Sequence, residues 1–113
     1  MFEKILKKDK GSEFNYCLYT PKDFEHDLKY PLIVFLHGAG ERGATDGSEL
    51  DAVLKQGLPK LFLKDDNIKA FLVIPQCPPE EEWNMNLKEL YAFIISLTKE
   101  YPIDTGRITL TGM

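Results

Sequence analysis

The stretch Pro31-Leu-Ile-Val-Phe-Leu-His-Gly-Ala-Gly-Glu-Arg-Gly43 decides the fold, because it joins a buried strand to a glycine-rich loop. Residues 32–36 form a continuous apolar run with β-branched members, which is typical of a strand covered on both faces. Gly38-Ala39-Gly40 follows at once, so backbone N–H groups become available where the strand ends. A phosphate cradle and an oxyanion hole both use such an arrangement.

Length and composition bound the kind of protein. The 113 residues, with 43% hydrophobic and 28% charged residues, predict one globular domain over residues 1–113. A net charge of −4 with interspersed signs gives no electrostatic case for nucleic acid. The first nine residues are too charged for a signal peptide, and no apolar run approaches the length that spans a membrane. We therefore expect a cytoplasmic protein without nucleic-acid or membrane partners.

The two cysteines, Cys17 and Cys77, lie far apart and lack the spacing of metal ligands. We interpret them as free thiols in a reducing compartment, with a disulfide between them as the alternative. We expect no metal site and no cofactor.

Hydrophobic periodicity predicts a hairpin followed by the order β-α-β-α-β, which indicates a mostly parallel sheet with antiparallel strands at its start. Ser48 is the expected start of the first helix and Gly57 its C-terminal cap. Tyr91 and Ile94 are interpreted as core residues of the second helix. The expected hairpin comprises residues 2–8 and 14–20 and turns near Lys10-Gly11, and further strands are expected at 32–36, 70–74 and 107–111. The second helix is expected to start at Asn86, which forms a capping box with Glu89. The apolar stripe of this helix is Leu87, Leu90, Tyr91, Ile94, Leu97 and Tyr101.

The glycine loop also fits the dinucleotide-binding pattern GxGxxG over residues 38–43. That pattern requires a helix to begin within the motif, whereas residues 44–47 continue as loop and the first helix signal is Ser48. It also expects an acidic residue at the end of the next strand, where this chain has Pro75-Gln76. The sequence therefore disfavours a nucleotide site.

Three segments carry a family resemblance: residues 37–43, the run Ile74-Pro75-Gln76-Cys77-Pro78 followed by Trp83, and residues 104–113. In this order they resemble α/β-hydrolase esterases of the dienelactone hydrolase, feruloyl esterase and phospholipase/carboxylesterase type. The first resembles the loop after the family's third strand, the second its next strand and loop, and the third the strand into the nucleophile elbow. The resemblance implies the N-terminal half of an α/β-hydrolase fold, ending at the elbow.

The resemblance also implies a serine carboxylesterase that acts on small-molecule short-chain or aryl esters through an acyl-enzyme. It points to the Ala39 N–H as an oxyanion donor, with Gly40 as second choice, while Gly38 and Gly40 permit the backbone angles of such a loop. His37 resembles the histidine before the oxyanion loop, so we expect it to fix the loop rather than act as a base. The family's base lies downstream of its nucleophile and acid.

Trp83 and Gln76 are the candidate substrate-binding residues, because they follow the C-terminal end of a parallel strand. Trp83 is interpreted either as an aromatic wall for an acyl or aryl group or as a residue that packs the loop. Gln76 either donates to substrate or caps the strand end, and we favour the structural role. Arg42 and Glu41 either orient the loop or face the pocket, although charged loop residues are usually solvated.

Gly112 and Met113 match the first two positions of the elbow pattern G-x-S-x-G, so the next residue would be the nucleophile. Ser12, Ser48 and Ser96 cannot replace it, and no Ser/His/Asp arrangement can be assembled from the sequence. We therefore expect this chain alone to be inactive. We expect residues 107–111 to pair with the remainder of the same protein or with a second copy. The alternative is a non-catalytic half-fold that serves as a binding or assembly module.

Overall fold

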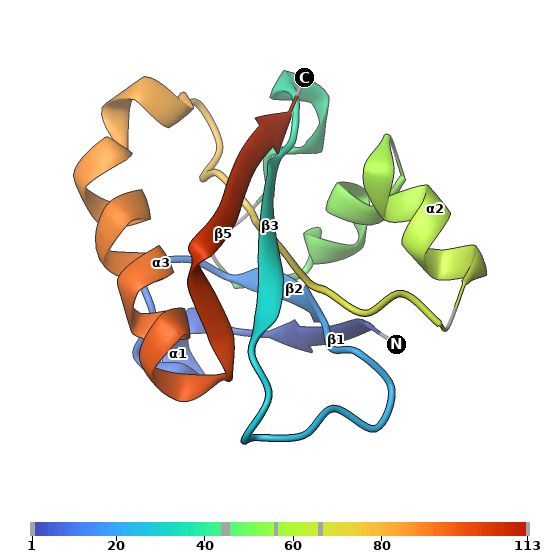
Figure 1. The fold of residues 1–113 in the computed structure, drawn as a ribbon. Coiled ribbons are helices and arrows are strands. Elements are labelled where there is room, and N and C mark those ends of the chain that lie inside the picture. The colour runs from blue at the N-terminus through green and yellow to red at the C-terminus, as the bar shows by residue number, and fades with distance from the viewer. Residues whose placement is uncertain (1, 44–45, 56, 66, 113) are drawn as a thin grey trace.

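The strands of the described residues form one mixed sheet in the order β1-β2-β4-β3-β5 (Figure 1). The structure is a computed structural model that describes residues 2–43, 46–55, 57–65 and 67–112. β1 pairs antiparallel with β2 and β2 with β4, whereas β3 runs parallel to both β4 and β5. This confirms an antiparallel hairpin followed by parallel strands. The strands are β1 (Phe2–Ile5), β2 (Tyr16–Tyr19), β3 (Tyr30–Leu36), β4 (Phe71–Pro75) and β5 (Ile103–Gly112).

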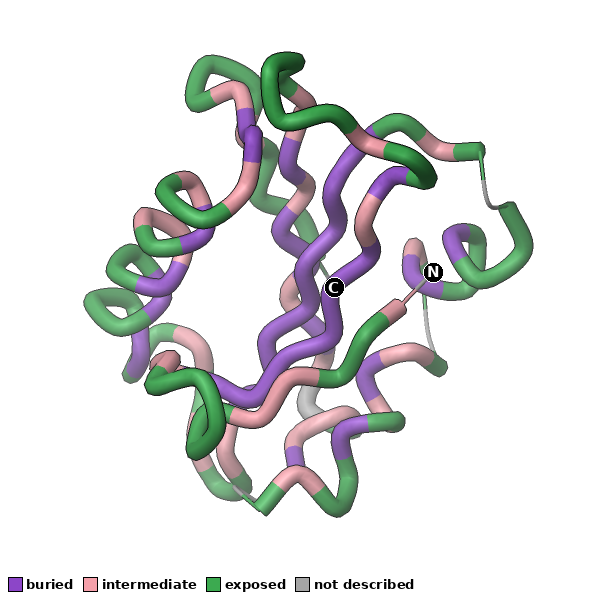
Figure 2. The backbone as a smooth tube through the Cα atoms, turned by 90° about the horizontal axis from the view of Figure 1, so that it is seen from below, coloured by how far each residue is buried: buried purple, intermediate pink, exposed green. Residues whose placement is uncertain are grey.

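Helices cover both faces of the sheet, and each face has its own apolar cluster (Figures 1 and 2). One face packs against α3 (Leu87–Glu100) through Leu90, Phe93 and Leu97. The other packs against the 3-10 turn η2 (Leu50–Leu54) and α2 (Leu58–Lys64). The remaining short elements are α1 (Lys7–Lys10), η1 (Ala39–Glu41) and η3 (Trp83–Met85). No helix among the described residues has the length and apolar character needed to cross a membrane.

The two strands that follow β3 in the sequence, β4 and β5, pair with opposite sides of β3 in the sheet. The connection from β3 to β4 runs through η2 and α2, and the next one crosses back over β3 through α3 to reach β5. The connections that leave β3 and β4 therefore depart toward opposite faces (Figure 1). Open α/β sheets bind ligands in the crevice at such a switch point, outside the carboxyl ends of the strands.

The hairpin is confirmed, but its first arm is shorter than expected. Lys7 and Lys8 lie in α1 rather than in a strand, and Gly11 ends this turn at φ +72°. The second arm is buried on both faces, which its period-two pattern did not predict. Phe14, Tyr16 and Leu18 pack in the cluster under α3, whereas Cys17 and Tyr19 pack in the opposite cluster. Both cysteines are free, as expected, and both are buried.

The prediction for Ser48 and Gly57 is wrong. The Ser48 N–H donates to Asp46 Oδ1 at 2.9 Å, and residues 50–54 form only a 3-10 turn whose N-cap is Glu49. Gly57, at φ +70°, precedes α2 instead of ending a helix. The helix α2 was not predicted, because Gly57-Leu58-Pro59 has the composition of a loop. Proline is tolerated in the first helical turn, where its missing N–H costs no hydrogen bond.

The helix α3 begins where expected, but its cap and its buried face differ. The Asn86 side chain makes no capping bond and instead donates to the Glu82 carbonyl at 3.0 Å. Tyr91, interpreted as core, is 70% exposed, so that prediction is wrong. The sheet covers only a narrow stripe of the helix, centred on Phe93, and the side that carries Tyr91 faces solvent.

Candidate active site

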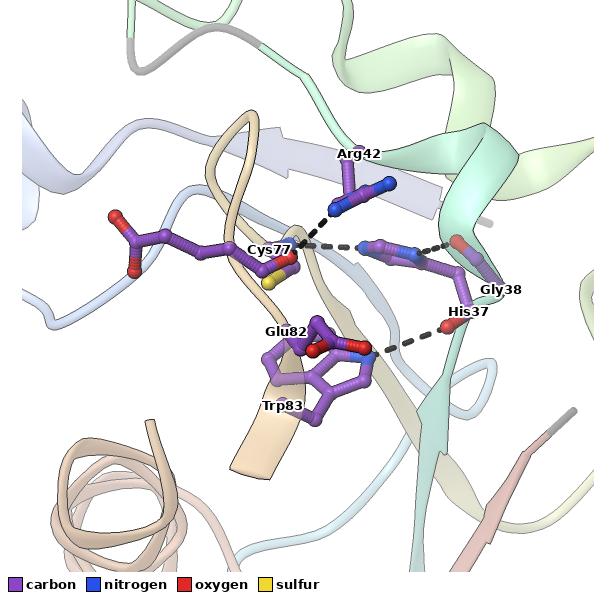
Figure 3. A pocket seen from close by; sticks show the side chains of 7 residues that line it. His37, Gly38, Arg42, Cys77, Glu82 and Trp83 are labelled. Carbon is purple, nitrogen blue, oxygen red and sulfur yellow. Dashed lines mark hydrogen bonds between the residues drawn. The ribbon is translucent and has the colours of Figure 1, made fainter. Parts of the chain in front are cut away.

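A cavity of about 190 Å³ lies where β3 and β4 end, at the switch point of the sheet (Figure 3). Its walls come from two loops that follow these strands and lie far apart in the sequence. One is the glycine loop (residues 37–43) and the other is the post-β4 loop (residues 76–82) with the first residue of η3. The lining residues are His37, Gly38, Arg42, Cys77, Glu81, Glu82 and Trp83.

His37 joins the two loops with both nitrogens of its ring (Figure 3). The Cys77 N–H donates to Nε2 at 2.9 Å, so this nitrogen is an acceptor and the proton sits on Nδ1. Nδ1 in turn donates to the Gly38 carbonyl at 2.6 Å. The side chain is 3% exposed. This arrangement leaves no ring nitrogen to accept a proton from a substrate.

The protonation of His37 is unfavourable in the folded state. Burial lowers the pKa of His37 below its usual value near 6.5, against smaller raising effects from the Gly38 carbonyl and Glu41 and a lowering effect from Arg42. A doubly protonated ring would also turn Nε2 into a donor that faces the Cys77 N–H. The neutral ring is therefore the form that holds the loops together.

We expect the free energy of unfolding of the complete protein to fall as the pH drops below about 6.5. Because the folded pKa of His37 is lowered, the unfolded state binds the proton more readily, so the stabilisation is complete above the unfolded pKa and is lost toward the folded one. Urea unfolding between pH 8 and pH 5 measures the slope. His37→Gln should flatten it, because it removes the buried imidazole. Equal slopes for wild type and His37→Gln would contradict the prediction.

The glycine loop contains a turn that the sequence analysis did not predict. Ala39–Glu41 form η1, in which the Glu41 N–H donates to the Gly38 carbonyl at 3.2 Å. The Gly38 N–H donates back to Glu41 Oε1 at 3.2 Å, so the turn is closed from both sides. The first N–H groups of a helical turn have no acceptor within it, which applies here to Ala39 and Gly40. The turn has three residues and is not the α-helix of a dinucleotide motif.

Trp83 lines the cavity and also packs the post-β4 loop. Its indole N–H donates to the His37 carbonyl at 3.2 Å, and its ring meets that of Phe14 edge-on at 5.5 Å. Both interpretations of this residue are therefore compatible with one position.

The cavity is also lined by Arg42, which was expected either to orient the loop or to face the pocket, and by Cys77, Glu81 and Glu82, which were not predicted as site residues from the sequence. Arg42 Nη1 donates to the Glu81 carbonyl at 2.9 Å, which adds another link between the loops (Figure 3). The signal that was available is their position, since all four lie in the loops that follow strands β3 and β4.

Gln76 lies outside the lining of this cavity. Its side chain is buried between the loops, where Nε2 donates to the carbonyls of Glu41 at 3.1 Å and Glu49 at 2.8 Å.

The C-terminal end of β5 reaches the same edge of the sheet. Gly112 pairs with Leu36, the last residue of β3, and a Cβ on Gly112 would lie 2.4 Å from the Leu36 carbonyl oxygen. Only glycine fits this approach. Met113 and residues 44–45 lie outside the described residues.

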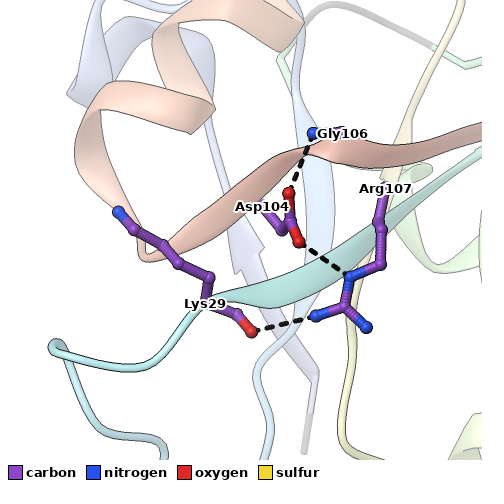
Figure 4. Close-up of polar contacts among 4 residues, drawn as sticks. All are labelled: Lys29, Asp104, Gly106 and Arg107. Atoms are coloured by element: carbon purple, nitrogen blue, oxygen red, sulfur yellow. Dashed lines mark hydrogen bonds and ion pairs between the residues drawn. The ribbon is translucent and has the colours of Figure 1, made fainter.

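The N-terminal end of β5 lies at the opposite end of the strands, where Tyr30 pairs with Ile103 and Leu32 with Ile108. The intervening residues bulge and are held by polar contacts (Figure 4). Asp104 accepts from the Gly106 N–H and from Arg107 Nε, both at 2.9 Å, and Arg107 Nη2 donates to the Lys29 carbonyl at 3.1 Å. The strand at 107–111 is thus confirmed as part of a longer β5.

Two of the three serine side chains bond to nearby backbone carbonyls. Ser12 Oγ donates to the Phe14 carbonyl, and Ser96 Oγ to the Phe93 carbonyl within α3. The described part of the chain also contains no cluster of three or more His, Cys, Asp or Glu side chains that could hold a metal ion.

Solved structures of esterases share this arrangement of strands and helices. A thermostable esterase superposes on all of this chain with a TM-score of 0.66 and 34% identity, and the match covers 34% of that structure. The chain has the N-terminal half of an α/β-hydrolase fold. This α/β-hydrolase half also superposes on a CE1 ferulic acid esterase of the anaerobic fungus Anaeromyces mucronatus, with a TM-score of 0.59, 20% identity, full coverage of this chain and 48% of that one.

The α/β-hydrolase half therefore spans between about a third and a half of the structures it resembles. No protein-family model and no curated protein sequence matches the chain. The resemblance to esterases thus rests on the three-dimensional arrangement and on the 34% identity to the thermostable esterase.

Proposed function

We propose that the complete protein is a serine carboxylesterase that hydrolyses small-molecule short-chain or aryl esters through an acyl-enzyme. One observation carries the proposal: the turn that begins at Ala39 lies beyond the end of β3, and Leu36 of that strand pairs with Gly112 of β5. A nucleophile that follows Met113 would therefore emerge beside the N–H groups of Ala39 and Gly40.

The proposed mechanism uses these N–H groups as an oxyanion hole. The serine attacks the ester carbonyl, and the negative charge that develops on its oxygen is stabilised by the Ala39 N–H and by the N–H after the serine. Collapse of the tetrahedral intermediate expels the alcohol, and water then hydrolyses the acyl-enzyme. The acid and base would come from the remainder of the polypeptide. This chemistry needs no metal or cofactor.

The cavity beside the glycine loop is the proposed site for the group next to the scissile ester. Trp83 gives it one aromatic wall, and its position is fixed by the bond to the His37 carbonyl. One of the similar structures is named a ferulic acid esterase, and ferulic acid carries an aromatic ring. The two buried free thiols agree with a cytoplasmic location, which remains part of the proposal.

A serine-directed probe tests the activity directly. We expect the native complete protein to be labelled by a fluorophosphonate and to turn over p-nitrophenyl esters, whereas heat-denatured protein should do neither. Peptide mapping should locate the label on the residue after Met113. A folded complete protein that neither reacts with the probe nor hydrolyses any such ester would refute the proposal and favour a non-catalytic binding module.

A further inference from the structure

The side chain of Gln76 ties together segments that are far apart in the sequence. Its two amide hydrogens go to the carbonyl of Glu41, the last residue of η1, and to the carbonyl of Glu49, just before η2. Its backbone N–H donates to the Asn15 carbonyl at 2.9 Å, which anchors the residue beside β2. A single amide thus connects the end of β4 with both ends of residues 41–49.

The Gln76 amide makes these contacts through the N–H donors of Nε2 and not through its oxygen, Oε1. The residue is 4% exposed, and Oε1 has no hydrogen-bond partner among the residues that the structure describes. A flipped amide would set an oxygen against two carbonyl oxygens, so the orientation is fixed by the bonds of Nε2. A buried donor held in this way resists displacement, because its loss would remove the donor that the Glu41 carbonyl has here, although the Glu49 carbonyl would keep the Ala52 N–H at 3.1 Å.

Gly43 lies so close to the same amide that there is no room for a side chain at this position. A Cβ at this position would lie 2.4 Å from Gln76 Nε2 and 2.8 Å from Cδ. The Gly43 N–H also donates to the Cys77 carbonyl at 3.2 Å, so the backbone there cannot easily withdraw. Any larger residue at Gly43 must push the Gln76 side chain away from its partners.

We propose that Gln76 is a positioning residue for the proposed esterase, acting through Glu41 on the N–H groups of Ala39 and Gly40. Glu41 is bonded to Gly38 by both its N–H and its carboxylate. A shift of the Glu41 carbonyl therefore displaces the turn that contains both N–H groups. This inference rests on the proposed function.

The displacement should act on the transition state more than on substrate binding. An oxyanion donor is effective only within roughly 2.7–3.1 Å of the developing charge. Gln76 does not line the cavity, so the binding of the substrate ground state should be little changed. The expected signature is a fall in kcat with KM nearly constant.

The experiment compares three variants of the complete protein. Gln76→Glu removes the donors, and Gly43→Ala displaces the amide without changing its chemistry. We expect each to lower kcat by roughly 10- to 100-fold, with KM within about threefold, since a misplacement near 1 Å can cost a factor of this order. Asp104→Asn weakens the bulge of β5 at the opposite end of the strands, so it should lower the melting temperature without changing kcat.

A pH profile separates positioning from a general loss of stability. The carboxyl group that Gln76→Glu introduces regains one donor when it is protonated, so kcat of this variant relative to wild type should rise as the pH falls from 8 to 6. Gly43→Ala should show no such rise. Should Gln76→Glu fail to fold, Gly43→Ala and Gln76→Met carry the same kcat and KM test.

Folded variants with wild-type kcat, or a loss confined to KM, would overturn the role of Gln76 while leaving the esterase proposal intact. An inactive wild-type protein would instead refute the esterase proposal itself. Both outcomes are read from the same set of assays.

Discussion

Replacing Ala39 by proline in the complete protein should lower kcat by about two to three orders of magnitude. This is the usual cost of removing one oxyanion donor from a preorganised site. Proline has no backbone N–H, so the substitution deletes the proposed donor directly. Turnover of a p-nitrophenyl ester by wild-type and variant protein measures the effect.

The structure makes proline a selective change at this position. Ala39 is the first residue of η1, and proline is favoured at the first position of a helical turn because the N–H there has no acceptor within the turn. The preceding residue, Gly38, is extended at φ −80° and ψ −178°, which agrees with the preference for an extended residue before proline. We therefore expect circular dichroism and the melting temperature to stay close to wild type.

Ala39→Gly is the matched control, since it changes the same side chain but keeps the N–H. Its turnover should remain within a few-fold of wild type. A folded Ala39→Pro variant with near-normal turnover would contradict the assignment and would make Gly40 the first candidate for the donor.

The sequence predicted most of the framework because its strands carry unambiguous signals. The apolar runs at 32–36 and 70–74 both became buried central strands, β3 and β4, and the order of elements gave the mixed sheet. The helix that starts after Asn86 was also located correctly.

The wrong predictions share a physical cause, because they depend on contacts that a local pattern does not contain. A glycine such as Gly57 can either end a helix or precede one. Here the helix follows it, because residues 58–64 pack against the sheet with Phe62 buried in the cluster that contains Tyr19. Tyr91 has the spacing of a core residue, but the sheet covers only the neighbouring stripe of α3.

The candidate site shows the same division. The glycine loop could be selected from the sequence, because a buried strand followed by glycines is a local signal. The role of Gln76 as a link to Glu41 and Glu49 could not be, since its partners lie 35 and 27 residues away. The pairing of both His37 nitrogens likewise depends on Cys77, which is 40 residues away.

Residues 1–113 expressed alone should show no esterase turnover and should self-associate through β5. This strand lies at one end of the sheet order and pairs only with β3 among the described residues. Leu110 on it is 57% exposed, and Tyr91 on α3 is 70% exposed. An exposed apolar edge strand presents unpaired N–H and C=O groups as a template for another chain. In the complete protein we propose that the remainder of the polypeptide pairs with this edge.

Light scattering on the purified 113-residue chain measures the effect, with species well above the 13.0 kDa monomer as the expected result. Leu110→Lys should raise the monomer fraction, because a charge on an edge strand opposes pairing with a second edge. Leu61→Lys is the matched control, since Leu61 is 62% exposed but lies on α2, on the other side of the sheet from α3. It should leave association unchanged. If the unmodified chain is a monodisperse monomer that melts cooperatively, β5 needs no partner strand, and the proposed pairing with the remainder of the polypeptide loses its physical basis.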